Sequence, residues 1–403
     1  ISASLVGSEM CIRDRLNDEP CCGSNDLLSG ILRKDWGFKG HVVSDCGAIN
    51  DIKSNHKFTL TDEQSVTYAI KGGVDLNCGN LYRKIPSAVK KGLLREKDVD
   101  KSLKRLLVTR YKLGMFEEKG SGPYDHLGSG HINSQENKEL AYMAASKSIV
   151  LLKNANSVLP LSKKLNTIFV TGPNAANIDM AIGNYNGLSP EIITPLEGIV
   201  SKVDYGVAVK YRLGVELNNP KPNPSFSMMH LASSSDATIA FMGISALIEG
   251  EEGDAILSTA NGDRVEIKLP KNQIKYIKEL RKRTNNKPLI LVVSSGSAID
   301  LSDVEELVDA IIYCWYPGEQ GGRAIAEILF GDVNPSGKLP ITLPKSIDQL
   351  PDYADYSMDN RTYKFLRDKP MYPFGYGLSY SKVKYSQISM SNIILNNNKE
   401  NAA

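Results

Sequence analysis

The sequence lacks the features that mark several large classes of protein. No apolar run approaches the roughly 20 residues of a membrane-spanning helix, so no membrane association is predicted. The formal net charge is only +2, from 48 basic and 46 acidic residues, which gives no reason to expect nucleic acid as a partner. The six cysteines show no CxxC pair and no metal-ligand spacing. Neither a disulfide framework, a metal site nor a cofactor is therefore predicted.

The 403 residues have the composition of a globular chain, with 41% hydrophobic and 23% charged residues. This length is too great for one ordinary core and predicts two or three domains. The first segment, 1–15 ("ISASLVGSEMCIRDR"), has neither the basic start and apolar centre of a signal peptide nor a helical period. It resembles a translated adapter sequence, and we leave it out of the predicted fold.

Helix-like and strand-like patterns alternate over residues 16–118. The expected elements are a helix at 24–38, a strand at 41–44, a helix opened by the capping box of Thr61 and Gln64, a strand at 74–79 and two further helices ending at Gly114. This order predicts βα repeats with a parallel sheet. Because two strands cannot bury both faces of such a sheet, the stretch is typical of the end of a larger barrel.

A Gly-rich polar stretch at 119–145, which ends in a helix starting near Ser134, is predicted to be a linker. A second α/β region follows at 146–345. Its expected strands are 148–154, 167–172, 237–243, 288–296 and 310–316, with helices at 270–284 and 319–330. Long apolar runs of this kind favour a buried parallel sheet with helices on both faces. A returning segment at 346–385 precedes an alternating pattern at 386–403 that is typical of a first β-strand.

The first chemical signal is "GHVVSDCGAI", residues 40–49, in which an apolar β-branched run ends at Asp45. Such an aspartate often caps a turn. The alternative is a catalytic carboxylate, because α/β barrels and open sheets carry their catalytic groups at the carboxyl ends of strands. Asp75, in "GVDLNCG", ends the next strand in the same way, although it could merely bind loop backbone.

The second signal is "LIEGEEGD", residues 247–254, which places four carboxylates within six residues. An acidic run of this kind is usually a solvated loop. Mutual repulsion can instead raise the pKa of one glutamate, so that it stays protonated and acts as an acid. An ionised aspartate and a protonated glutamate are the pair that glycoside hydrolysis requires.

Two glycine-containing stretches are weaker signals. "TGPNAAN", 171–177, follows a strand but has no GxGxxG and no lysine of a phosphate loop, so nucleotide binding is disfavoured. "YPGEQGG", 316–322, places Glu319 at a helix start, where exposed N–H groups could bind an anion or sugar hydroxyls. Close packing of helix against strand explains these glycines equally well.

In order along the chain, these stretches resemble the family 3 glycoside hydrolases of the β-glucosidase and β-xylosidase type. The stretches that carry the resemblance are "PCCGSNDLLSGILRKDWGFKGHVVSDCGAI", "GVDLNCG", "EGEEGD" with "GDR", "WYPGEQGGRAIAEILFGDVNPSGKLPITLP" and "YPFGYGLSY". The resemblance implies an α/β fold: the C-terminal part of a TIM-like (β/α)8 barrel at 16–118, an α/β sandwich domain at 146–345 and the start of a fibronectin type III-like domain at 386–403.

The resemblance also implies roles for individual residues. Asp45 falls on the nucleophile of the family, flanked by Ser44 and Cys46 as substrate-binding residues. Many members carry tryptophan where this chain has Cys46, which leaves the choice of sugar open. Glu251 is the best match to the acid/base, with Glu249 and Glu252 as alternatives.

The implied activity is that of a retaining, exo-acting β-glycosidase acting on β-linked oligosaccharides or aryl glycosides, with glucose and xylose both possible. A periplasmic or extracellular location is expected, and no oligomeric state is predicted. Sugar-holding residues of the earlier barrel strands are not found, so the chain is expected to be an incomplete copy with little or no activity. The alternative is a carbohydrate-binding or structural fragment without catalysis.

Overall fold

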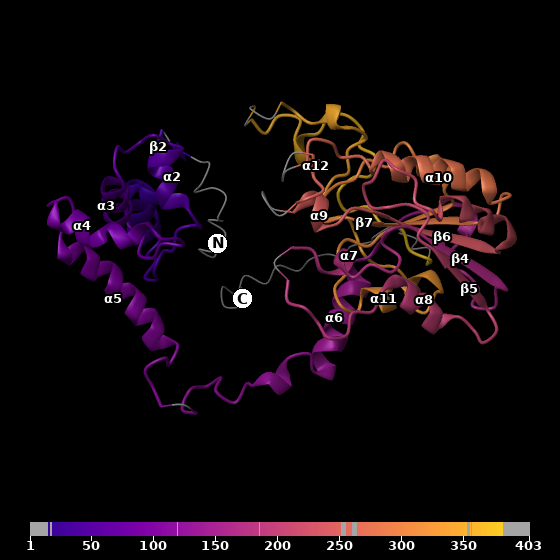
Figure 1. Cartoon of the computed structure of the whole chain (residues 1–403), viewed down its shortest axis with the longest axis horizontal. Coiled ribbons are helices and arrows are strands. Elements are labelled where there is room, and N and C mark those ends of the chain that lie inside the picture. Colours follow the sequence, from indigo (N-terminus) through magenta and orange to yellow (C-terminus); the bar gives the residue numbers. More distant parts are fainter. Residues whose placement is uncertain are drawn as a thin grey trace, which may run out of the picture. The chain divides into compact units, whose positions relative to one another are not determined.

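The computed structural model describes residues 15–16, 18–118, 120–184, 186–250, 255–259, 264–352, 355 and 357–381 (Figure 1). The chain divides into two compact units, Ile1–Ser129 and Gly130–Ala403. Within the described ranges, no helix is both long and apolar enough to cross a membrane.

The first unit is mainly helical. Its elements are β1 (Arg15–Leu16), β2 (Glu19–Pro20), η2 (Cys21–Gly23), η3 (Asp26–Asp35), α2 (Ala48–Ser54), α3 (Asp62–Gly72), η4 (Leu81–Lys84), α4 (Ile85–Lys90) and α5 (Glu96–Lys112). The predicted capping box is confirmed: Thr61 and Gln64 each accept a hydrogen bond from the other's backbone, and α3 ends at Gly73 with a φ of +127°.

The two strands predicted in this unit are reduced to a single parallel bridge between Val43 and Leu76. The backbone there is still continuously paired, because the Val42 carbonyl accepts from the Asp75 and Leu76 amides and the Ser44 amide donates to the Leu76 carbonyl. Beneath it, Ile49 and Ile52 of α2 pack with Ala69 of α3 in a small buried cluster.

The second unit is an α/β sandwich. After η5 (Ser129–His131) its elements are α6 (Gln135–Ser148), β3 (Val150–Asn154), η6 (Ala155–Ser157), β4 (Thr167–Thr171), α7 (Asp179–Ile182), α8 (Pro195–Lys202), β5 (Ala208–Arg212), η7 (Phe226–Ser234), β6 (Ala237–Gly243), α9 (Ala246–Glu249), α10 (Lys271–Arg283), β7 (Leu289–Ser294), η8 (Glu305–Leu307), β8 (Ala310–Tyr313), α11 (Gly321–Leu329), η9 (Ile347–Gln349) and α12 (Thr362–Phe365).

Six strands form the sheet in the order β3-β8-β7-β6-β4-β5, with β3 antiparallel to β8 and the other neighbours parallel. The prediction of a mixed α/β fold with a mainly parallel sheet is thereby confirmed. The edge strand β5 was not predicted, because its residues are only partly buried and its sequence "AVKYR" has no continuous apolar run.

Alternate side chains of each strand enter two separate cores, one on each face of the sheet. Phe169 packs with Tyr276 and Leu280 of α10, whereas the neighbouring Val170 packs with Ile199 of α8 and Ala324 of α11. Figure 1 shows α10 on one side of the strands and α8 with α11 on the other. The predicted coverage of both faces by helices is confirmed.

The chain returns to this unit after the sandwich. Tyr372 forms an antiparallel bridge with Leu343, and Leu378 forms one with Leu151 of β3, so the segment lies along the edge of the sheet. The strand predicted within 386–403 lies outside the described residues.

Candidate active site

Asp45 lies where the bridged segment ends and α2 begins. Gly47, directly before α2, has a φ of +83°, a left-handed conformation that glycine adopts without strain and that allows the sharp turn. The Asp45 side chain is half-buried, and its Oδ1 accepts a 2.6 Å hydrogen bond from the Cys46 amide. Among the described residues no cation pairs with this carboxylate. The side chain is thus oriented through one oxygen while remaining accessible.

The two neighbours of Asp45 face the segment that follows Asp75. Ser44 is buried, and its Oγ accepts from the Cys78 amide at 3.1 Å and donates to Asn77 Oδ1 at 3.3 Å. Cys46 forms a disulfide with Cys78, with 4.3 Å between the Cα atoms. The prediction that no disulfide is indicated was therefore wrong for this pair. A separation of 32 residues carries no local signal, and only the pairing of the two segments brings the sulfurs together.

Asp75 is buried between two guanidinium groups, with a side chain that is 0% exposed. Its Oδ2 accepts from Arg33 Nη2 at 2.6 Å and from the Val42 amide at 3.0 Å, and its Oδ1 accepts from Arg105 Nη1 at 2.8 Å. Burial lowers the pKa of the Arg33 guanidinium, and the Asp75 carboxylate opposes that effect. The interpretation in which Asp75 merely binds loop backbone holds only in part: Asp75 does bind backbone, at the Val42 amide of the paired segment, but the two arginines, 42 and 30 residues away, were missed.

Glu249, at the end of α9, is enclosed by protein donors. Its carboxylate accepts from the Gly296 amide and from the Ser297 and Tyr316 hydroxyls. Arg264 Nη1 lies 3.7 Å from its Oε2, and only 9% of the glutamate side chain is exposed. A general acid must reach the leaving oxygen of a substrate. With both oxygens already bound inside the protein, Glu249 is poorly placed for that role.

These contacts also identify residues that were not singled out from the sequence. Burial raises the pKa of the Tyr316 hydroxyl, and the nearby Glu249 carboxylate adds to the effect. Burial lowers the pKa of the Arg264 guanidinium, opposed by the same carboxylate. Tyr316 belongs to "YPGEQGG" and Arg264 to "GDR", so both lie in stretches that carried the resemblance. The other two acid candidates, Glu251 and Glu252, lie outside the described residues.

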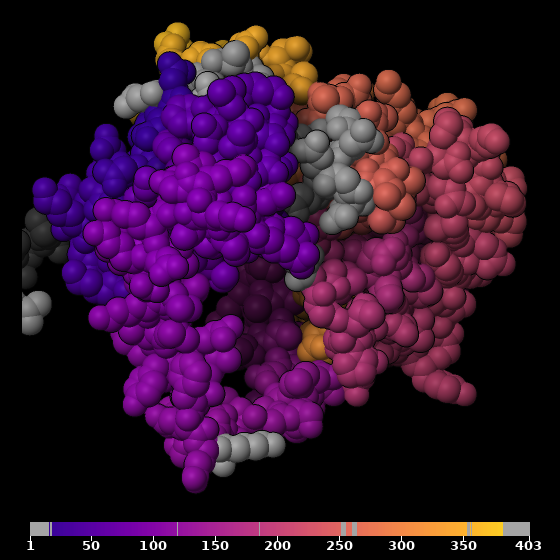
Figure 2. Space-filling view, turned by 60° about the vertical axis from the view of Figure 1, so that its left-hand side comes forward, coloured from indigo at the N-terminus to yellow at the C-terminus, as the bar shows by residue number. Residues whose placement is uncertain are grey.

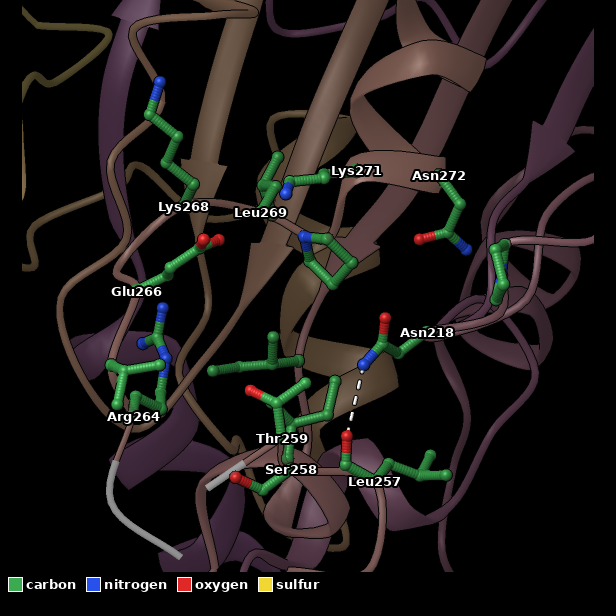
Figure 3. Close-up of a pocket in the computed structure, with 15 residues that line it drawn as sticks. Asn218, Leu257, Ser258, Thr259, Arg264, Glu266, Lys268, Leu269, Lys271 and Asn272 are labelled. Carbon is green, nitrogen blue, oxygen red and sulfur yellow. Dashed lines mark hydrogen bonds between the residues drawn. The ribbon is translucent and has the colours of Figure 1, made fainter. Parts of the chain in front are cut away.

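A pocket of about 300 Å³ with both polar and apolar lining lies in the same unit, between α10 and the segments on either side of residues 260–263 (Figure 3). Asn218 donates from its amide to the Leu257 carbonyl at 3.2 Å, and Arg264, Lys271 and Asn272 contribute further polar groups. Among the described residues that line it, Glu266 supplies the one carboxylate. The described lining of this pocket therefore lacks the pair of carboxyl groups that glycoside hydrolysis requires.

No group of three or more metal-ligating side chains occurs within the described part of the chain. Gly322 of "YPGEQGG" has a packing role, because a Cβ there would lie 2.1 Å from the Thr194 carbonyl oxygen, whereas Gly318 has a left-handed φ of +73° and open space around it. Gly172, in "TGPNAAN", would likewise place a Cβ 2.1 Å from the Phe241 carbonyl oxygen. Gly172 and Gly322 are thus explained by close approach of backbones.

Two family models match the chain. The glycosyl hydrolase family 3 N-terminal domain matches residues 7–109, and the family 3 C-terminal domain matches residues 149–380. A xylan 1,4-β-xylosidase of Xylanibacter ruminicola is 31% identical over 94% of this chain and 61% of its own length. A periplasmic β-glucosidase of Salmonella typhimurium is 32% identical over 96% of this chain and 54% of its own length.

Solved structures give the same result. A family 3 exo-β-xylosidase in complex with a xylobiose aziridine probe superposes with a TM-score of 0.82 at 29% identity, over 91% of this chain and 47% of the other. A β-glucosidase from Listeria innocua in complex with isofagomine gives 0.76 at 25% identity, over 91% and 51%. The chain spans between about half and 61% of the length of these curated relatives. Since the C-terminal model alone covers more than half of its residues, the chain belongs to glycosyl hydrolase family 3.

Proposed function

We propose that the protein to which this chain belongs is a retaining, exo-acting β-glycosidase that releases xylose or glucose from the non-reducing ends of β-linked oligosaccharides and aryl glycosides. The observation that carries the proposal is the placement of Asp45. Its carboxylate stands at the end of a paired segment, is oriented through Oδ1 by the Cys46 amide and is half-exposed. Relatives from a bacterium and from Medicago sativa subsp. varia are named as β-xylosidases.

In the proposed mechanism, Asp45 attacks the anomeric carbon and forms a covalent glycosyl-enzyme. A protonated glutamate gives its proton to the leaving oxygen and then, as a carboxylate, takes one from the attacking water. We assign this acid/base role to Glu251, with Glu252 as the alternative, because the contacts of Glu249 leave it structural. Such a mechanism requires the two carboxyl groups to lie about 5–5.5 Å apart during catalysis.

We also propose that residues 16–118 are the C-terminal part of a TIM-like barrel, that 119–145 are a linker and that 386–403 begin a fibronectin type III-like domain. We propose a neutral rather than an acidic sugar. An acidic sugar needs a basic side chain near the nucleophile to bind its carboxylate, and among the described residues none is paired with Asp45. The Cys46–Cys78 disulfide supports a periplasmic or extracellular location, since disulfides persist in oxidising compartments.

Trapping of the nucleophile tests this function. The chain and its Asp45→Asn variant are incubated with a β-xylosyl or β-glucosyl aziridine, and the label is located by peptide mass spectrometry. We expect the label on Asp45 and none in the variant. Even a slow enzyme accumulates label, because each molecule reacts once. NMR of the first product from an aryl β-xyloside should show the β-anomer.

Labelling elsewhere, hydrolysis that survives Asp45→Asn, or an inverted first product would each overturn the proposed mechanism. We expect the Asp45→Asn variant to fold, because the one side-chain hydrogen bond of the half-exposed Asp45 among the described residues is to its neighbour Cys46, and such substitutions usually change stability little. Comparison of aryl β-xyloside, β-glucoside and β-glucuronide then defines the sugar, and a preference for the glucuronide would contradict the proposed neutral substrate.

A further inference from the structure

We infer that Asp75, clamped between Arg33 and Arg105, is a positioning residue that sets the location of the Asp45 carboxylate. The inference rests on the proposed function only in taking Asp45 as the nucleophile. Asp75 is not itself placed to touch a substrate, since its side chain is 0% exposed. Instead, its carboxylate binds the amide of Val42, in the backbone segment that ends at Asp45.

Asp75, Arg33 and Arg105, which we call the clamp, bind the backbone of both paired segments. Arg33 also donates to the Gly40 carbonyl at 2.8 Å and to the Gly73 carbonyl at 3.2 Å, so one guanidinium ties together the starts of both paired segments. The Asp75 carboxylate holds the Val42 amide at 3.0 Å. A buried carboxylate with two guanidinium partners and a backbone donor has little freedom to move.

Between the clamp and the nucleophile, the two segments are bonded residue by residue. The Ser44 amide donates to the Leu76 carbonyl at 2.9 Å, and the Cys78 amide donates to Ser44 Oγ at 3.1 Å. The Gly47 amide donates to the Cys78 carbonyl at 2.9 Å, beside the Cys46–Cys78 disulfide. Asp45 therefore lies between an ionic anchor at one end of the paired segments and a covalent anchor at the other.

This arrangement separates two tasks. The disulfide limits how far the segments can part, and the clamp fixes where the segment of Asp45 begins. Removing one arginine contact should leave both segments in place but let the carboxylate shift. A shift of about 1 Å in a reacting group can lower a rate about 100-fold without changing substrate binding.

The test uses the whole chain labelled with ¹⁵N at cysteine, because two of its six cysteine amides report directly on the site. The Cys46 amide donates to Asp45, and the Cys78 amide donates to Ser44. Arg105→Gln, which removes one guanidinium, should shift both signals, whereas Arg105→Lys, which keeps the charge, should restore them largely. Asp75→Asn should shift them further. The amide of Cys314, which donates to the Val293 carbonyl in the other unit, should not move.

Asp98→Asn is the matched control. Asp98 is also buried and paired with an arginine in the same unit, Arg95, but no hydrogen bond or ion pair described for its side chain reaches residues 42–47. If it shifts the Cys46 amide as much as Arg105→Gln does, the effect is general loosening and the inference fails. Unchanged Cys46 and Cys78 signals in Arg105→Gln would equally overturn it, whether or not Asp75→Asn folds.

The rate of aziridine labelling, which a slow enzyme still shows, gives the second readout, and aryl β-xyloside kinetics adds to it if the chain turns over measurably. Arg105→Gln should lower kcat, or the rate of labelling, by about 10- to 100-fold while KM changes less than about twofold, and Arg105→Lys should recover most of the loss. A rise in KM with unchanged kcat would contradict a positioning role. If the Cys46 signal shifts but Asp45→Asn leaves hydrolysis intact, the positioning stands and the proposed function is the part that fails.

Discussion

Glu327 of α11 shows how a single buried carboxylate depends on its partners. It accepts from the Tyr142 hydroxyl, and Lys202 Nζ and Arg323 Nε lie 2.6 and 3.4 Å from its Oε1. Burial acts to raise its pKa, but these partners outweigh burial, and the pKa of the carboxyl lies below its usual value. In the unfolded chain a glutamate titrates near 4.3.

A depressed pKa in the folded state means that the unfolded chain binds more protons at low pH. The contribution of Glu327 is therefore complete above the unfolded pKa and is lost as pH falls through the lower folded value. We expect Glu327→Gln to reduce the free energy of unfolding by about 1.5–3 kcal/mol near pH 7, and by progressively less below about pH 4.

Thermal unfolding of both proteins between pH 3 and pH 7 measures this difference. The control is Glu279→Gln, because Glu279 has a similar lysine partner, Lys282, on an exposed part of α10. Exposed ion pairs contribute little, so this variant should unfold near the wild-type temperature. A Glu327→Gln deficit that grows as pH falls would contradict the assigned sign.

At the scale of residues, the sequence predicted those features that depend on local pattern. The position of Asp45 followed from an apolar run ending at a carboxylate, and the Thr61–Gln64 cap followed from residue types three apart. The enclosure of Glu249 could not be predicted, because its donors come from residues 296–316, which meet α9 only in the folded sheet. The Cys46–Cys78 pair was missed for the same reason.

Helices α8 and α11 cross where each carries a glycine. A Cβ on Gly198 would lie 2.0 Å from the Gly322 carbonyl oxygen, closer than any real contact, and neither glycine needs a left-handed φ. A Cβ on Gly322 would in turn lie 2.1 Å from the carbonyl oxygen of Thr194, the N-cap of α8, so we expect Gly322→Ala to force the helices apart and to destabilise the second unit by about 1–3 kcal/mol. Gly187→Ala is the control, since its Cβ would meet nothing within 4 Å.

Chemical denaturation followed by circular dichroism measures this cost. The deficit should appear as a lower midpoint with an unchanged slope, because packing alters stability without altering the surface exposed on unfolding. Equal stability of Gly322→Ala and Gly187→Ala would show that the α8–α11 contact is not as close as described.

At the scale of elements, prediction succeeded where a strand is buried on both faces. The runs of β4, β6, β7 and β8 are almost wholly apolar because each side chain enters one of two cores. It failed for β5, which forms one edge and is only partly buried. The 41–44 and 74–79 runs were apolar enough to predict strands. A stable sheet needs further strands beside such a pair, and in the described residues these two segments pair with each other alone and form one bridge.

The molecule as a whole has two units joined by an exposed connection. Among the described residues between α5 and α6, the short η5 is the only helix or strand, and the side chains of Leu113, Tyr124 and Ile132 are 71, 75 and 76% exposed. Figure 2 shows this connection, in magenta, at the molecular surface. Protease recognition needs an accessible backbone that can open locally, so the first cuts should fall at residues 113–134.

The two products of this cleavage should then differ in lifetime. The second unit buries two large cores against six strands, whereas the first has two small clusters and exposes Leu103, Leu107 and Tyr111 along α5. Fewer buried contacts mean a smaller free energy of opening, so the first unit should be digested while a fragment that includes residues 146–345 persists. Limited trypsin digestion with intact-mass analysis of the fragments measures both steps. First cuts within β3 to β8, or a first unit that outlasts the second, would contradict this order of stability.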